Sequence, residues 1–307
     1  MANTERNKAR LLAIAAAVLF STGGAGIKVE SFNAAQVSTV RSGVAAVALL
    51  LWLRGRIRWT PRSLAAAVIY AATLSSFVGA TKLTTAANAI FLQATAPLYL
   101  LLLAPLVLRE HVSRREVVYL AAVAAGMVFC FFGEPAPTST ASNPALGNWL
   151  GIASGLAWAL TLLTLRSIGR DDHTNETTVA AVVGGNVLAC LAALPFALPM
   201  PRGATAEWIT LAALGVFQIG LAYVCLSSAI RHLPALEISL LLLLEPVLNP
   251  VWTWIVRAED PGRWTIVGGA VIVGATMIKL LVAARNDPPQ KTSLATKVTK
   301  KHKENSG

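Results

Sequence analysis

Ten apolar runs separated by short polar stretches divide the chain, and they constrain its fold more than any other feature of the sequence. Each run is close in length to the roughly 20 residues that an α-helix needs to cross the hydrocarbon core of a bilayer. The runs cover residues 10–27, 34–53, 64–81, 86–108, 117–132, 146–165, 178–198, 208–230, 236–256 and 264–281. The sequence therefore predicts an all-α membrane protein with ten transmembrane helices.

Composition excludes the other broad classes of protein. Charged residues make up 13% and hydrophobic residues 55% of the 307 positions, whereas a soluble domain carries about 25% charged residues. With 22 glycines and 3 cysteines, the chain is neither collagen-like nor a disulfide scaffold. The cysteines, Cys130, Cys190 and Cys225, lie inside apolar runs and are interpreted as small packing residues.

The net charge of +11 is interpreted as a signal of orientation. Arginine and lysine collect in the amino-terminal segment and in the loops at 54–62 and 109–115, and they are missing from the loop at 133–145. Because basic residues stay on the cytoplasmic side, both termini are expected to be cytoplasmic, although Arg257 and Arg263 lie in a loop that is then outside. The lysine-rich tail fits anchoring at the inner leaflet and not nucleic-acid binding.

The two halves of the chain resemble each other when one is offset against the other. An offset of 149 residues aligns Pro97 with Pro246, and an offset of 138 aligns Phe20 with Trp158. Because each unit holds five spans, an odd number, the second is inverted relative to the first, which is typical of secondary transporters. The predicted division is a cytoplasmic N-terminus at 1–9, a first repeat at 10–132, an external linker at 133–145, a second repeat at 146–284 and a basic cytoplasmic tail at 285–307.

The second half also carries a series of motifs that resembles a known family. In order, the motifs are Ala229-x-Arg231-x-x-Pro234-Ala235, Leu244-Glu245-Pro246, Glu259, Gly268-Gly269 and Gly274. The series is similar to the ten-helix exporter branch of the drug/metabolite transporter superfamily, and within it to bacterial exporters of amino acids, including aromatic ones. The resemblance implies a central cavity between two bundles and transport without an ATPase.

Motifs for enzymatic chemistry are missing from the sequence. Residues 23–28 are glycine-rich but lack the spacing of a phosphate-binding loop. The four histidines lie in loops or in the tail, so no metal site is expected within the spans. The chain is therefore expected not to be an enzyme and to need no metal or other cofactor.

Three ionisable residues lie inside the apolar runs, where a charge at the centre of a helix costs on the order of 2.5 to 3.5 kcal/mol. Arg41 is interpreted as a structural residue that bonds to carbonyls or reaches the interface, ahead of a role in substrate binding. Glu237 begins the ninth run, which predicts a place near a membrane surface and a role there at least as readily as one in coupling. Glu245 is the most interior of the three.

Glu245 directly precedes Pro246, and Pro97 is the equivalent proline of the first half. Proline removes a backbone donor, so both helices are expected to bend at these points. A carboxyl group beside such a bend is suited to bind a cation or an ammonium group, or to take up a proton during exchange. A structural hydrogen bond that holds the bend is an alternative of equal weight.

Polar and aromatic residues at mid-membrane are predicted to form the substrate site. In the fourth run, Asn88, Thr95 and Tyr99 lie within about 20° of one another if the run is one continuous helix. The other candidates are Trp158, Gln218 and Tyr223. Aromatic rings with a few polar groups suit amphipathic organic solutes, and core packing is the alternative for each residue taken alone.

The predicted function is export of small metabolites across the inner membrane, by alternating access around a central cavity. Amino acids, including aromatic ones, are the favoured substrates, with drugs, purines and nucleosides as alternatives within transport. A non-transporting membrane scaffold is the alternative from another class. The expected partners are a small-molecule substrate and the lipid bilayer, with no nucleic acid, and exchange for protons is left open.

Overall fold

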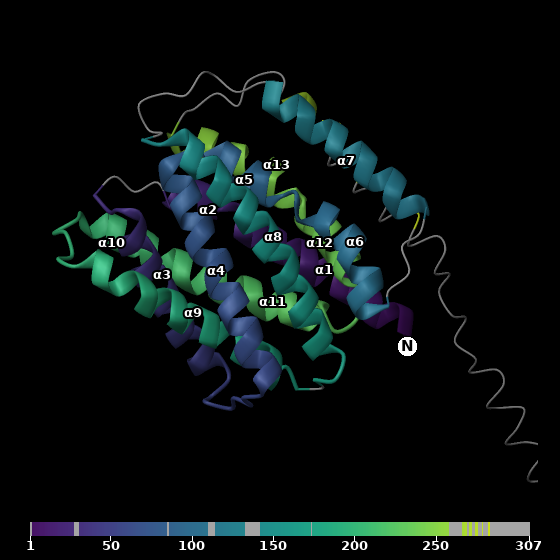
Figure 1. The fold of residues 1–307 in the computed structure, drawn as a ribbon, viewed down its shortest axis with the longest axis horizontal. Coiled ribbons are helices and arrows are strands. Elements are labelled where there is room, and N and C mark those ends of the chain that lie inside the picture. The colour runs from purple at the N-terminus through teal and green to yellow at the C-terminus, as the bar shows by residue number, and fades with distance from the viewer. Residues whose placement is uncertain are drawn as a thin grey trace, which may run out of the picture.

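The computed structural model describes residues 2–27, 31–84, 86–109, 114–132, 142–172 and 174–257, and separate positions between 266 and 282. Every regular element in these residues is a helix. The helices gather into one bundle, with α7 (Arg114–Phe132) along its edge (Figure 1). The described part of the chain therefore has the predicted all-α architecture.

The helices fall on either side of residues 133–141 in the sequence. Before them lie α1 (Ala2–Ser21), α2 (Gly23–Ile27), α3 (Ala34–Trp52), α4 (Pro61–Leu83), α5 (Ala86–Gln93), α6 (Ala96–Leu108) and α7. After them lie α8 (Pro144–Gly169), α9 (Glu176–Ala197), α10 (Thr205–Ala213), the π-helix η1 (Leu214–Leu221), α11 (Ala222–Ala229), α12 (Ala235–Leu242) and α13 (Leu244–Arg257). These two groups are called the first and second halves below.

Seven of the predicted spans are helical segments long and apolar enough to cross a membrane, and three of them combine two or more of these helices. They are Thr4–Ile27, Ala34–Trp52, Pro61–Leu83, Ala89–Leu108, Ala145–Gly169, Glu176–Ala197 and Thr205–Ala229. The fifth predicted span falls in α7, the ninth is divided between α12 and α13, and most of the tenth lies outside the described residues. The part of the chain that the structure describes is thus all-helical, as expected of a helical membrane protein.

Polar residues at the ends of the loops determine where the long helices begin. At the start of α3, the Asn33 side chain accepts a hydrogen bond from the Gln36 N–H, and the Gln36 side chain accepts one from the Asn33 N–H. Thr60 and Ser63 form the same reciprocal pair at the start of α4. Each pair satisfies two backbone donors that a helix end leaves open. The cap at Asn33 places Arg41 about two turns inside α3.

Two spans are interrupted beside a proline, at equivalent positions of the two halves. α5 ends at Gln93 and α12 ends at Leu242, and these two positions are 149 residues apart. Pro97 and Pro246 follow four residues later, and neither has an N–H to donate to the carbonyl oxygen at 93 or 242. The loss of that hydrogen bond explains why each helix ends there and a new helix starts after a short turn.

The fourth predicted span is consequently divided between α5 and α6, whereas the predicted common face of Asn88, Thr95 and Tyr99 assumed one continuous helix. Thr95 lies in the turn between α5 and α6, where its hydroxyl donates a hydrogen bond to the Leu92 carbonyl at 2.6 Å. The regular helix of about 100° per residue is therefore interrupted between α5 and α6.

Helices of the two halves pack against each other along their length. α4 lies along α8 and α9, α3 along α9 and η1, and α1 along α11 and α13. Glycines permit the closest approaches: a Cβ atom at Gly185 in α9 would overlap the Tyr70 ring of α4 and lie 2.9 Å from the Ala67 carbonyl oxygen. A Cβ atom at Gly215 in η1 would lie 2.8 Å from the Arg41 carbonyl oxygen. These contacts bring polar residues of α3, α4 and η1 together between the halves.

Candidate functional site

A small cavity lies between the two halves. It is bounded by residues of α1, α3, α4, α5, α8, η1, α11 and α13, and its volume is about 40 Å³. Such a volume holds water molecules but is far below the roughly 300 to 1,000 Å³ of pockets for small organic ligands. Its polar and aromatic lining includes Arg41, Tyr70, Gln93, Trp158, Gln218, Tyr223 and Glu245.

A second hollow of about 20 Å³ adjoins this cavity and shares Gln93, Trp158 and Glu245 with it. Pro97 lines it from the interruption between α5 and α6, and Pro246 lines it from the interruption between α12 and α13. The two broken spans therefore face each other across the hollow. Breaks of this kind let a chain line a polar site at membrane depth.

Arg41 is the charged residue buried most deeply in the site. Its relative exposure is 1%, and its Nη1 donates a long hydrogen bond of 3.3 Å to the Gln218 Oε1. Its Nε and Nη2 atoms are buried and have no hydrogen-bond partner among the described residues. An unpaired buried cation is costly, so the arrangement favours an anionic group in the cavity.

Glu245 is the acidic residue that lines both hollows. It lies in the first turn of α13, where the helix dipole favours a negative charge. Its carboxyl group makes no ion pair or hydrogen bond with the described residues, including Arg41. The cavity thus has one guanidinium group and one carboxyl group in its wall, and the two are not paired with each other.

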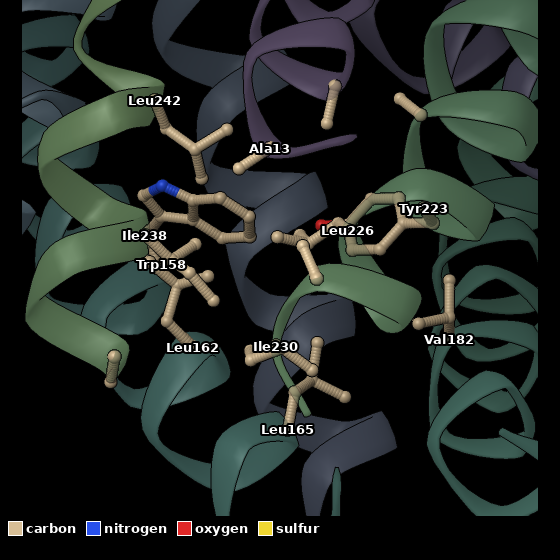
Figure 2. Close-up of a cluster of buried hydrophobic side chains, with 14 of the residues drawn as sticks. Ala13, Trp158, Leu162, Leu165, Val182, Tyr223, Leu226, Ile230, Ile238 and Leu242 are labelled. Carbon is tan, nitrogen blue, oxygen red and sulfur yellow. The ribbon is translucent and has the colours of Figure 1, made fainter. Parts of the chain in front are cut away.

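Aromatic rings also line the cavity, and Phe20 packs edge to face against Tyr223 and Trp158. The ring centroids of Tyr70 and Tyr223 are 4.8 Å apart, and those of Phe20 and Tyr223 are 5.2 Å apart. Phe20 also meets the Trp158 ring at 6.1 Å and 85°. The Trp158 and Tyr223 rings also meet, at 6.3 Å and 83°, and Figure 2 shows Trp158 near Leu242, so the aromatic wall continues into the apolar core.

The structure brings half of the predicted substrate-site residues together. Trp158, Gln218 and Tyr223 line the cavity with Glu245. Thr95 bonds within its own turn, and Tyr99 packs against the apolar core, so neither lines the two hollows. Asn88 belongs to α5, but its side chain lies outside the described residues.

Glu237 lies apart from the cavity, in an ion-pair cluster that joins α1 to α12. Its Oε1 accepts a hydrogen bond from the Arg10 Nε at 2.9 Å, and its Oε2 accepts one from the Arg6 Nη2 at 2.9 Å. Its side chain is 6% exposed, and that of Arg10 is 7% exposed. The residue is therefore buried and paired across the two halves.

Several residues of the cavity were not among the predicted site residues. Arg41 was interpreted as structural, although its charge inside an apolar run was a visible signal. Gln93 was detectable as an amide in the fourth run, and its Nε2 donates a hydrogen bond to the Ser154 hydroxyl at 2.8 Å. Tyr70 carried no sequence signal, because only the packing of α4 against α9 and α11 places it at the cavity.

Comparison with known proteins agrees with the architecture. The pseudopaline exporter CntI of Pseudomonas aeruginosa, in strains UCBPP-PA14 and PAO1, is 27% identical over 277 residues, which are 86% of this chain and 93% of that protein. A solved crystal structure with 20% identity superposes with a TM-score of 0.69, covering 92% of this chain and 99% of the other, and shows a shared fold.

The profile of one protein family matches both halves of the chain, over residues 7–132 and 145–281. These two segments contain most of the sequence and all of the cavity residues described above. The predicted superfamily is therefore confirmed. The chain belongs to the EamA-like transporter family, within the drug/metabolite transporter superfamily.

Proposed function

We propose that this protein is a secondary exporter of small metabolites in the inner membrane, with amino acids, including aromatic ones, as its substrates. The observation that carries the proposal is the cavity between the two halves, which combines Arg41, Glu245 and aromatic rings. Trp158, Gln218 and Tyr223 form its substrate site. The protein acts as a transporter and not as an enzyme.

The size of the cavity supports alternating access. At about 40 Å³ it has no room for an amino acid, so a substrate enters only when the two halves separate. The helices are interrupted at Gln93 and Leu242. The backbone can bend at these two interruptions when the halves separate. In the proposal, the two bundles rock around the cavity and open it to one side of the membrane at a time.

The proposed topology has ten transmembrane helices in two inverted repeats at 10–132 and 146–284, joined by an external linker at 133–145. The segments 1–9 and 285–307 are both cytoplasmic. The equivalent helix breaks and the match of one family profile to both halves support the duplication. A reporter enzyme that is active only outside the cytoplasm, fused to the C-terminus, is expected to be inactive.

A second candidate substrate class comes from the relatives. The matched Pseudomonas aeruginosa proteins are exporters of pseudopaline. Export of pseudopaline or a similar solute by this chain is therefore added to the alternative of other amphipathic solutes, such as drugs, purines and nucleosides. For this reason, pseudopaline is one of the solutes in the counterflow assay described below.

Coupling to protons is assigned to Glu245 in this proposal, because its carboxyl group lines the cavity without an ion-pair partner among the described residues. A carboxyl group that binds a proton when the cavity opens to one side of the membrane, and releases it when the cavity opens to the other, would exchange protons for the solute. The test is Glu245→Gln in proteoliposomes with an imposed pH gradient. Unchanged transport with an unchanged pH dependence would remove the coupling role.

The experiment that tests the function is counterflow of labelled solutes into liposomes that contain the purified protein. Labelled phenylalanine, tryptophan, leucine and lysine, a nucleoside and pseudopaline are supplied outside against an unlabelled excess inside. Accumulation of amino acids above that in protein-free liposomes is the expected result. If no solute in the panel moves, the protein is not this transporter, and the scaffold interpretation gains support.

A further inference from the structure

We propose that Arg41 binds the carboxylate group of the transported solute, and that Glu245 in the same cavity selects solutes that also carry a cationic group. The proposal deepens the proposed function and rests on it. The juxtaposition that carries it is a buried guanidinium and a carboxyl that line one cavity without pairing with each other.

The unpartnered atoms of Arg41 are those that suit a carboxylate. The Nη1 atom is engaged with Gln218, whereas Nε and Nη2, which lie on one edge of the planar guanidinium, are both buried and free of partners among the described residues. Two parallel N–H donors on one edge match the two oxygens of a carboxylate. A lone cation would leave this edge unsatisfied, and a neutral solute would leave its positive charge uncompensated.

The surroundings of Arg41 hold the guanidinium in place. Gln218 belongs to the π-helix η1, and such helices occur frequently at functional sites. Gly215 lets η1 approach the Arg41 backbone, and Gly23 leaves space for the Gln218 amide, which lies 2.7 Å from where a Cβ atom would be. Gln218 is therefore a positioning residue for Arg41.

Neither Arg41 nor Glu245 is already paired with a charged residue in the described part of the protein. Arg41 makes no ion pair with a described residue, and neither does Glu245. A zwitterionic solute satisfies both groups at once and adds no net charge to the cavity. The rings of Tyr223 and Trp158 line the same cavity and offer an apolar surface to its side chain.

Three related probes test the proposal on the unmodified protein. Phenylalanine carries both charged groups, phenylalanine amide lacks the carboxylate, and 3-phenylpropionate lacks the amine. In counterflow corrected for leakage into protein-free liposomes, phenylalanine is expected to move with a half-saturating concentration roughly ten- to hundredfold lower than either analogue. This measurement needs no variant and therefore does not depend on whether a variant folds.

Variants then assign each group to its residue. Arg41→Gln is expected to raise the half-saturating concentration of phenylalanine at least tenfold and to leave that of the amide unchanged, and Arg41→Lys is expected to recover part of the loss. Glu245→Gln is expected to narrow the preference for phenylalanine over 3-phenylpropionate. The control is Arg62→Gln, since Arg62 is 71% exposed and lies outside the cavity.

The outcomes separate the two proposals. Transport of the amide as efficient as that of phenylalanine, or Arg41→Gln with an unchanged half-saturating concentration for phenylalanine, overturns the role of Arg41 while the transporter function stands. Transport restricted to a nucleoside or another solute without a carboxylate has the same consequence. If no solute moves at all, the proposed function fails, and this inference fails with it.

Discussion

The buried ion pair between Arg10 and Glu237 allows a quantitative test of how the two halves are held together. Glu237→Gln keeps the shape of the side chain and removes its charge. The Arg10 side chain is only 7% exposed, and it then loses a charged partner at 2.9 Å. Removing one member of a buried ion pair typically destabilises a protein by about 3 to 5 kcal/mol, because the remaining charge stays buried.

The chain offers a matched control in a second ion pair. Arg62 and Asp171 approach to 3.3 Å, but their side chains are 71% and 76% exposed. Exposed pairs contribute about 0 to 1 kcal/mol, so Asp171→Asn is expected to have little effect. The double variant Arg10→Met with Glu237→Leu is expected to recover most of the stability lost in Glu237→Gln, since it buries no charge at either position.

The assay is denaturant unfolding of the purified protein in detergent micelles, with wild type and the variants measured under identical conditions. The free energy of unfolding is expected to fall in Glu237→Gln by several times the change in Asp171→Asn. Equal effects of the two single variants would refute the reasoning, because burial would then not determine the strength of the pair. A double variant less stable than Glu237→Gln would do so as well.

Three further predictions follow from packing, pKa and hydrogen bonding. Gly185→Ala is expected to destabilise the protein by about 1 to 3 kcal/mol, because its Cβ overlaps the Tyr70 ring, whereas Gly43→Ala, whose Cβ meets only a sulfur at 3.4 Å, is neutral in the same thermal unfolding assay. Burial raises the pKa of Asp172, but donors of Thr178 and Thr174 outweigh it and hold the pKa below its usual value. The stabilisation that the ionised Asp172 carboxylate gives the fold is thus complete at neutral pH and is lost as the pH falls below about 4. The stability difference between wild type and Asp172→Asn is therefore expected to shrink between pH 7 and pH 3. Trp252→Phe removes a hydrogen bond of 2.7 Å to the Ser21 hydroxyl and is expected to cost about 1 kcal/mol in thermal unfolding.

The membrane spans were predictable because the length of an apolar run is a local property of the chain. Seven of the predicted runs are helices that can cross a bilayer. The superfamily was predictable for a related reason, since motifs such as Leu244-Glu245-Pro246 are read directly along the chain. The predicted face of Asn88, Thr95 and Tyr99 assumed one regular helix, whereas the helix is interrupted where Pro97 removes a hydrogen bond.

By itself, the sequence determined the all-helical membrane architecture, the places where prolines interrupt the helices, and the superfamily. Only the tertiary structure decided which polar residues share a cavity. Tyr70 of α4 meets Tyr223 of α11 where Gly185 lets α9 pack closely on α4, and Arg41 meets Gln218 because Gly215 lets η1 approach α3. The physical reason is that hydropathy and proline chemistry act within one segment, whereas the cavity depends on close contacts between helices that are far apart in the sequence.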